Sequence, residues 1–207
     1  MKKYVITIAR GFGSGGKTIG RLLAQRLDVD YYDNDLIRLA SEESGINLEL
    51  FGKADEQVKT NLFKRYNRAY GSKLLPPDSD EFVSSDNLFN YQAKIIRDLA
   101  DKQNCIIIGR CGDYILKDNE NVIRLFVYAD PKTCIKNVVD MYGVTPKEAH
   151  ERIVSLDRAR AAYYKYYTGK NWDDVRNYDL CINTSSIGFE KAVDIIVDYM
   201  KQIGYEL

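Results

Sequence analysis

Five short apolar stretches recur along the chain, and segments with helical spacing of apolar residues separate them. The first, Tyr4–Ala9, is apolar and rich in β-branched residues, which is typical of a strand buried on both faces of a parallel sheet. The other predicted strands are Asp30–Tyr32, Cys105–Ile108, Val122–Ala129 and Asp179–Asn183. Because strands alternate with helices, the pattern predicts an α/β fold built on a doubly wound, parallel, five-stranded sheet.

Apolar residues at helical spacing predict the helices between these strands. They are expected at Lys17–Leu27, Leu36–Ala40, Leu88–Lys102, from Pro131, from Thr145 toward Ala162, and at Phe189–Ile203. Thr145 and Glu148 have capping-box spacing, and a proline follows Thr145 at the first helical position. Asp33 or Asn34 is expected to cap the helix after the second strand.

The segment at about residues 46–87 interrupts this alternation. Helical pieces are expected near Leu48–Tyr70, and Gly71–Asp80, which contains two consecutive prolines, is expected to form a mobile loop. We therefore expect a single domain with a mostly helical insertion at this point. The core of that domain would comprise about residues 1–45, 88–144 and 178–207.

Composition excludes several classes of protein. The 207 residues include 30 Lys plus Arg and 30 Asp plus Glu, a balance that argues against a globally basic nucleic-acid binder. No apolar run approaches the ~20 residues that span a bilayer. Four scattered cysteines and a single histidine argue against a Cys/His zinc site and favour reduced thiols in a cytoplasmic protein. We expect small-molecule partners rather than nucleic acid or membrane.

The strongest motif lies between the first strand and the first helix. It reads Gly11-Phe12-Gly13-Ser14-Gly15-Gly16-Lys17-Thr18 and matches G-x-x-x-x-G-K-[ST] at every fixed position. The glycines allow backbone N–H groups to turn inward, and the positive end of the following helix favours phosphate oxygens. Lys17 would reach the β and γ phosphates of a nucleotide, and the Thr18 hydroxyl would ligate Mg²⁺. Gly11, Gly13, Ser14, Gly15 and Gly16 complete the expected nucleotide-binding set.

A phosphate-binding loop by itself does not define the reaction. The chain lacks the Asn-Lys-x-Asp sequence with which GTPases read guanine, and the Cys105–Ile108 strand ends in Gly109-Arg110 rather than in an acid typical of motors. An arginine at the carboxyl end of a strand points into the ligand crevice of an open α/β sheet. This favours a second anionic ligand, as in a kinase that transfers a phosphoryl group to another phosphate.

The residues quoted so far, with three further segments, resemble the cytidylate kinase-like family of nucleoside monophosphate kinases. The segments are Gly11–Thr18, Tyr32–Arg38, Ile107–Tyr114, and Asp157–Arg160 followed by Tyr178–Thr184, in this order over nearly the whole chain. The resemblance implies a P-loop NTPase-type core that holds ATP, an insertion that closes over the acceptor nucleotide, and an arginine-bearing lid at about residues 145–177.

The resemblance also implies roles for charged residues. The expected acceptor-site residues are Asp33, Asp35, Arg38, Arg110 and Asp157, of which Arg110 would hold the acceptor phosphate. The expected catalytic cations are Lys17, Arg110, Arg158 and Arg160, with Arg152 as a further lid candidate. Each of these has a plainer interpretation. The acids can cap a helix, Arg38 can be a surface residue, and the lid arginines can form an ordinary charged helix face.

One position departs from the family pattern. Cytidylate kinases typically carry an acid just before the Gly-Arg pair, where this chain has Ile108, and Asp113 or Asp35 is the alternative candidate for orienting Mg²⁺-bound water. The tyrosine pairs at residues 163–164 and 166–167 favour packing of a lid or a subunit contact over base stacking, which leaves a homodimer open.

The function that these observations favour is Mg²⁺- and ATP-dependent phosphoryl transfer to a nucleoside monophosphate, CMP or dCMP before others. Two alternatives stay open. One is a kinase of another small phosphorylated acceptor, and the other is a nucleotide-binding regulator with little transferase activity.

Overall fold

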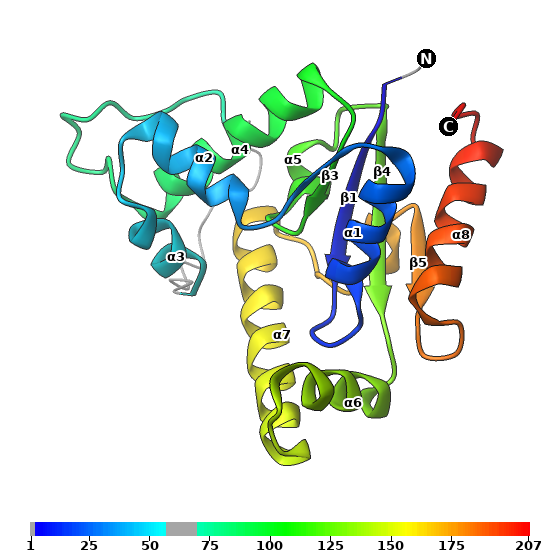
Figure 1. The fold of residues 1–207 in the computed structure, drawn as a ribbon. Helices are drawn as coiled ribbons and strands as arrows, with labels where there is room; N and C mark the ends of the chain where they lie inside the picture. Colours follow the sequence, from blue (N-terminus) through cyan, green and yellow to red (C-terminus); the bar gives the residue numbers. More distant parts are fainter. Residues whose placement is uncertain (1–2, 57–69) are drawn as a thin grey trace.

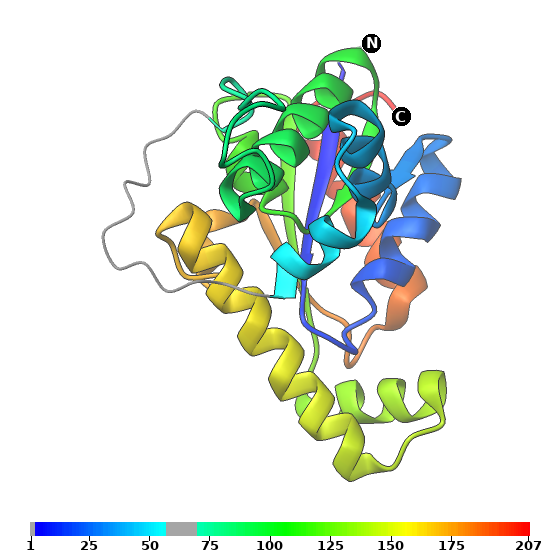
Figure 2. The same cartoon turned by 90° about the vertical axis from the view of Figure 1, so that its left-hand side faces the viewer.

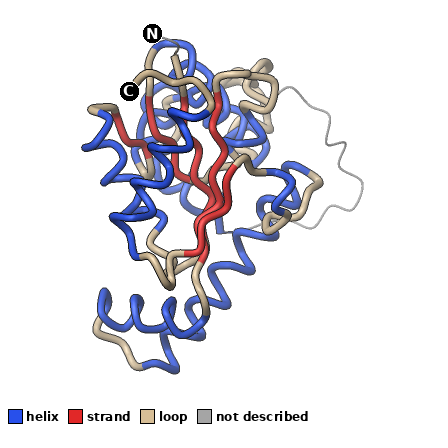
Figure 3. The backbone as a smooth tube through the Cα atoms, turned by 90° about the vertical axis from the view of Figure 1, so that its right-hand side faces the viewer, coloured by secondary structure: helices blue, strands red, loops and turns tan. Residues whose placement is uncertain are grey.

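The centre of the structure is a β-sheet, drawn in red in Figure 3. Its five strands all run parallel, in the order β2–β3–β1–β4–β5. This computed structural model describes residues 3–56 and 70–207. The strands are β1 (Val5–Arg10), β2 (Asp30–Tyr32), β3 (Cys105–Ile108), β4 (Val122–Tyr128) and β5 (Leu180–Asn183). All five predicted strands are confirmed, and no bound differs by more than one residue.

Alternate residues of the central strands pack into apolar cores on opposite faces of the sheet. In β3, Cys105 and Ile107 belong to one core, whereas Ile106 and Ile108 belong to the other, and all four are fully buried. Burial on both faces explains why this strand is a continuous apolar run rather than an alternating one.

Helices cover both faces of the sheet (Figure 1). Helices α1 (Gly16–Leu27) and α8 (Gly188–Gln202) pack together on one face. The other face carries α4 (Ser85–Lys102), the single turn α5 (Gly112–Ile115) and the C-terminal part of α7 (Pro146–Thr168). The remaining helical elements are α2 (Asp35–Ser44), α3 (Leu48–Glu56), α6 (Pro131–Tyr142) and the 3-10 turn η1 (Val175–Asn177).

Helix α6 and the N-terminal half of α7 extend beyond the carboxyl ends of the strands (Figure 2). The predicted capping box starts α7. The Thr145 hydroxyl accepts from the Glu148 N–H at 3.3 Å, and the Glu148 carboxylate accepts from the Thr145 N–H at 2.8 Å. Local sequence thus determines where this projecting helix begins.

The expected end of α7 near Ala162 was wrong, because the helix continues to Thr168. Its last turns carry tyrosines that pack into the core beside α4. The Tyr167 ring stacks on Phe89 at a centroid distance of 3.8 Å, and Tyr163 contacts both rings. The aromatic residues therefore anchor the base of this helix within the chain. The start of α4 also differs, since the helix begins at Ser85, three residues before the predicted start, with Ser84 as its cap.

Two helices that follow β2 pack on α4, and the second of them, α3, belongs to the predicted insertion. Helix α2 lies against α4, and α3 contacts both. Of the helical pieces expected near Leu48–Tyr70, α3 is confirmed, and residues 57–69 lie outside the described residues. The following stretch, Gly71–Asp80, is non-helical as predicted. Within residues 3–56 and 70–207, no helix combines the length and the apolar character needed to cross a membrane.

Candidate active site

The glycine-rich loop between β1 and α1 has a shape that only glycine adopts without strain. Gly13 and Gly15 have φ values of +82° and +89°. A Cβ atom on Gly13 would lie 2.6 Å from the carbonyl oxygen of Cys134, and one on Gly15 would overlap the Phe189 ring. Both the backbone conformation and the close neighbours therefore require glycine at these positions.

Hydrogen bonds from several elements hold this loop. The buried Ser14 hydroxyl donates to the Gly11 carbonyl at 2.8 Å. The Thr184 hydroxyl, just after β5, donates to the Ser14 carbonyl at 2.8 Å, and the Asn137 amide of α6 donates to the Gly13 carbonyl at 2.8 Å. These hydrogen bonds tie the loop to α6 and to the end of β5. Asn137 belongs to no motif in the sequence, whereas Thr184 is the last residue of the Tyr178–Thr184 segment.

The N-terminus of α1 follows this loop and carries no side-chain cap. Its N-cap residue is Gly15, and its first turn contains no acid. Ser84, Asp130 and Thr145 cap α4, α6 and α7 with their side chains, whereas α2 and α8 share with α1 the lack of a side-chain cap. An uncapped N-terminus offers N–H groups and a partial positive charge to an anion. Thr18 is half-buried in the first turn.

Lys17 and Asp33 face each other across the crevice. The Lys17 ammonium lies 2.5 Å from the Asp33 carboxylate, which comes directly after β2. The Asp33 side chain is only 10% exposed, whereas that of Lys17 is 45% exposed. Asp33 does not cap α2, since Asn34 takes the N-cap position without a side-chain bond. The carboxylate therefore belongs to the site, and Lys17 keeps access to solvent and ligands.

Arg110 stands on a strained turn after β3. Gly109, Arg110 and Cys111 have consecutive φ values of +68°, +57° and +54°, which is unfavourable for the two residues that carry a Cβ. Burial lowers the pKa of the Arg110 guanidinium, while Asp33 and the Tyr163 hydroxyl act in the opposite direction. The Arg110 guanidinium is therefore largely removed from solvent and is influenced electrostatically by Asp33.

Two charged residues of α7 contact the loop. The Asp157 carboxylate accepts from the Phe12 N–H at 2.9 Å and pairs with Arg160 at 2.9 Å. Arg160 also donates to the Arg10 carbonyl at 3.2 Å, and its guanidinium lies over the Phe12 ring at 5.5 Å. Burial raises the pKa of Asp157, and Arg160 limits the rise. The projecting helix is thus docked on the phosphate-binding loop through two of the predicted site residues.

Other predicted residues lie elsewhere. Arg38 and Asp35 are exposed on α2, where Arg38 pairs with Glu42 at 2.6 Å and with Asp35 at 3.9 Å. Arg158 and Arg152 are exposed on α7, and Arg152 lies 5.9 Å from the Tyr142 ring centroid. None of these four lines the cavity beside the loop. Lys17 pairs with Asp33, Arg160 pairs with Asp157, and Asp33 acts electrostatically on Arg110. Of these five residues only Lys17 and Arg160 line the cavity, and the other four predicted residues are exposed on the surface.

That cavity, which we call the loop pocket, has a volume of about 540 Å³. It is bounded by the glycine loop, α6, α7 and the start of α8. Its apolar side chains include Met141, Tyr142, Leu156 and Phe189, and the first three are 63%, 49% and 40% exposed. Exposed apolar groups beside a phosphate-binding loop offer a surface on which a nucleobase can pack.

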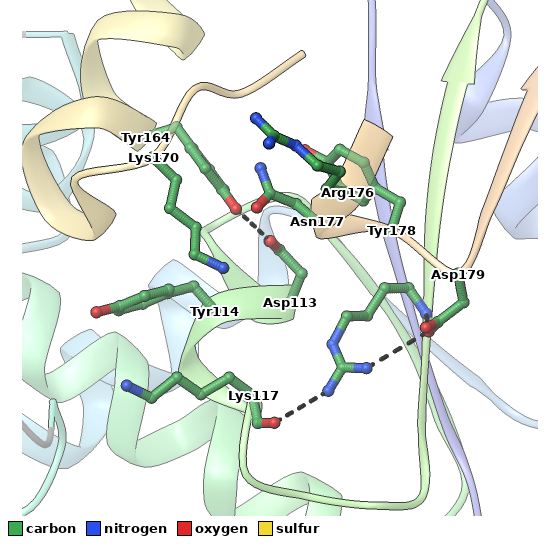
Figure 4. Close-up of a pocket in the computed structure, with 10 residues that line it drawn as sticks. Asp113, Tyr114, Lys117, Tyr164, Lys170, Arg176, Asn177, Tyr178 and Asp179 are labelled. Atoms are coloured by element: carbon green, nitrogen blue, oxygen red, sulfur yellow. Dashed lines mark hydrogen bonds and ion pairs between the residues drawn. The ribbon is translucent and has the colours of Figure 1, made fainter. Parts of the chain in front are cut away.

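Asp113, an alternative candidate for orienting Mg²⁺-bound water, lines a second cavity (Figure 4). Its carboxylate is 7% exposed and accepts from the Tyr164 hydroxyl at 2.6 Å. Burial raises the pKa of Asp113, whereas this hydrogen bond lowers it. Asp113 is not among the residues of the loop pocket, and Ile108 is fully buried in the core. The carboxylate beside Lys17 is Asp33.

Sequence reasoning missed Arg10. This residue is the last of β1, directly before the glycine loop, and its guanidinium lies 4.0 Å from Asp33. The sequence contains a feature that identifies it. Arg10 is a charged residue at the end of a buried strand, and Arg110 was selected as a candidate for the same reason.

Curated proteins that bear the name cytidylate kinase are similar to this chain. A "Cytidylate kinase" of Methanococcoides burtonii is 26% identical over 185 residues, with 87% of both chains covered. A "Cytidylate kinase" of Pyrococcus horikoshii is 23% identical over 206 residues, which cover 98% of this chain and 92% of that protein.

Among solved structures, an uncharacterized protein from Eubacterium ventriosum superposes with a TM-score of 0.71 at 26% identity, covering 96% of this chain and 99% of that one. A shikimate kinase from Bacteroides thetaiotaomicron, at 13% identity and a TM-score of 0.54, covers 97% of this chain and 99% of its own and shows the same P-loop kinase fold. The model of the cytidylate kinase-like family matches residues 5–186, and the chain belongs to that family.

Proposed function

We propose that this protein transfers the γ-phosphoryl group of ATP to a nucleoside monophosphate, with CMP or dCMP as the favoured acceptor. Membership of the cytidylate kinase-like family makes it a nucleoside monophosphate kinase-like phosphotransferase. The preference for cytidine nucleotides is inferred from the relatives that bear the name cytidylate kinase. The observation that carries the proposal is the meeting of Lys17, Arg110 and Asp33 at the carboxyl ends of neighbouring strands, beside the uncapped N-terminus of α1.

The loop pocket accounts for ATP as the donor. Its polar floor is the glycine loop with Lys17 and Thr18, which suits a triphosphate, and its apolar wall suits a base. The Thr18 hydroxyl, in the first turn of α1, is the group that would hold Mg²⁺ together with phosphate oxygens and water. Among the described residues, no group of three His, Cys, Asp or Glu side chains could hold a metal. Mg²⁺ bound at Thr18 would neutralise charge on the phosphates.

The transfer needs no covalent intermediate. An oxygen of the acceptor phosphate attacks the γ phosphorus, the bond from that phosphorus to the bridging oxygen of ADP breaks, and the products are ADP and a nucleoside diphosphate. The residues of this site supply alignment and positive charge, from Lys17, Arg110 and Arg160. We propose that the helical insertion at about residues 46–87 and the lid at about residues 145–177 close over the substrates and exclude water.

The test is release of ADP from ATP and Mg²⁺ with CMP, dCMP, UMP, AMP and GMP supplied in parallel. We expect turnover with CMP or dCMP, loss of turnover in Lys17→Ala, and unchanged turnover in Lys201→Ala, a matched change at an exposed lysine of α8. Omission of Mg²⁺ is expected to abolish transfer. If ATP binds and none of the five acceptors is phosphorylated, the proposal fails. A kinase of another phosphorylated acceptor or a nucleotide-binding regulator would then remain.

A further inference from the structure

The side chain of Arg10 crosses the floor of the crevice, beneath both phosphate-binding segments. A Cβ atom on Gly16, in the glycine loop, would lie 2.9 Å from the Arg10 Cγ atom. A Cβ atom on Gly109, before Arg110, would overlap the Arg10 guanidinium. One glycine from each segment therefore leaves room for this side chain, which is 15% exposed.

The charges around Arg10 are unbalanced. Its guanidinium lies 4.0 Å from Asp33, but the same carboxylate lies 2.5 Å from Lys17. Burial lowers the pKa of Arg10 to about 10, and repulsion by Arg160 and Arg110 adds to the effect. Four cations, Arg10, Lys17, Arg110 and Arg160, thus share two carboxylates, Asp33 and Asp157. Such an excess of positive charge in a partly buried crevice is relieved when an anion binds.

Arg10 also carries a buried donor that no described residue satisfies. Within the described part of the chain, its Nε–H has no hydrogen-bond partner. A buried donor without an acceptor costs about 1–3 kcal/mol. A residue that only supported the turn at Gly109 would gain nothing from this charge or from this donor, and an apolar side chain of the same length would fill the space without the penalty.

We propose that Arg10 is a phosphate-binding residue of the transfer site, and that its guanidinium contacts a phosphoryl oxygen at the junction of the donor and acceptor phosphates. The inference rests on the proposed function for the identity of the ligand. The position fits because Arg10 spans from the loop that would hold the donor to the turn that carries Arg110. A guanidinium can satisfy two oxygens of one phosphate at once, and it stays charged where burial would neutralise a weaker base.

A probe that contains no nucleoside tests this assignment without depending on the acceptor. Binding of inorganic tripolyphosphate would be measured by calorimetry on the wild type, Arg10→Met, Arg10→Lys and Arg26→Met. Arg26 is the matched control, an exposed arginine of α1 that pairs with Asp194. We expect about tenfold weaker binding in both Arg10 variants, because lysine lacks the bidentate fork, and unchanged binding in the control.

Kinetics separate binding from support of the fold. With an acceptor that the wild type phosphorylates, we expect kcat to fall about 100-fold or more in Arg10→Met, on the scale of one lost transition-state donor. Melting temperatures without ligand would be measured in parallel, and we expect those of wild type and Arg10→Lys to be similar. If Arg10 only supports the fold, Arg10→Met should melt at a lower temperature than wild type, and both variants should bind tripolyphosphate as tightly as wild type. Arg10→Lys should then also have the kcat of wild type. That pattern overturns the proposal.

The remaining outcomes are also decisive. If the wild type does not bind tripolyphosphate, or if a folded Arg10→Met binds it within twofold of wild type, Arg10 is not a phosphate ligand. If no acceptor is turned over but Arg10→Met still loses tripolyphosphate binding, the assignment of Arg10 stands and the proposed transferase activity fails. Should both variants be unfolded, a crystal structure of the wild type with tripolyphosphate decides. A guanidinium nitrogen within hydrogen-bond distance of a phosphate oxygen supports the proposal, and a guanidinium that makes no such bond refutes it.

Discussion

Replacing Tyr164 by phenylalanine tests how the base of α7 is attached to the core. The Tyr164 hydroxyl donates a 2.6 Å hydrogen bond to Asp113, and the two residues are only 4% and 7% exposed. The variant keeps the ring and removes the donor, so apolar packing changes little. A buried acceptor that loses its partner costs about 1–3 kcal/mol. For a chain of this size that loss lowers Tm by about 2–12 °C.

The stability that Tyr164→Phe loses is expected to increase with pH. Burial raises the pKa of Asp113 above its ordinary 3.8, and the hydrogen bond from Tyr164 limits the rise. A carboxyl whose folded pKa is raised binds its proton more tightly in the folded state, so stability declines as pH rises from 3.8 through the folded pKa. Removing the tyrosine donor raises the folded pKa further. Tyr164→Phe is therefore expected to lose more stability at pH 8 than at pH 4.

Urea unfolding at pH 4 and pH 8 would measure the effect in wild type, Tyr164→Phe, Asp113→Asn and the double variant. Asp113→Asn is the matched control, since its amide oxygen can still accept from Tyr164 while the titrating charge is gone. In the Asp113→Asn protein, Tyr164→Phe should lower the free energy of unfolding by a smaller amount, and this amount should be the same at both pH values. A loss for Tyr164→Phe below about 0.5 kcal/mol at pH 8, or an equal loss at both pH values, would refute the reasoning.

Three further changes test the loop and the projecting helix. Gly15→Ala places a Cβ at a φ of +89° against the Phe189 ring, so calorimetry should show ATP binding weakened about tenfold or more, with Gly52→Ala, where a Cβ meets nothing within 4 Å, as the unaffected control. Thr145→Ala removes the cap of α7 and should cost about 1 kcal/mol in urea unfolding, and an unchanged midpoint would contradict the capping role. Asp157→Asn removes a negative charge beside the loop while keeping an acceptor for the Phe12 N–H, so tripolyphosphate should bind about fivefold more tightly at pH 7, and weaker binding would count against this electrostatic reasoning.

Local patterns in the sequence were enough to place the elements and the phosphate-binding loop. The four apolar residues of β3 predict a strand buried on both faces, and the Thr145 and Glu148 spacing predicts where α7 begins. The glycine motif likewise predicts a loop between a strand and a helix. These features depend on contacts within a few residues, such as side-chain periodicity and capping bonds, which spacing along the chain encodes directly.

Contacts between distant elements were decided only by the tertiary structure. The sequence analysis predicted both Asp33 and Asp35 as substrate-binding residues. In the structure Asp33 lies beside Lys17, whereas Asp35 is exposed. Arg10, which the motif does not include, lies below the loop, whereas Arg38 pairs on the surface of α2. The end of α7 was extended by tyrosines that bury their rings against α4. Burial and cross-element distance set the energy of each charge, and both depend on how helices and strands pack, which no local pattern specifies.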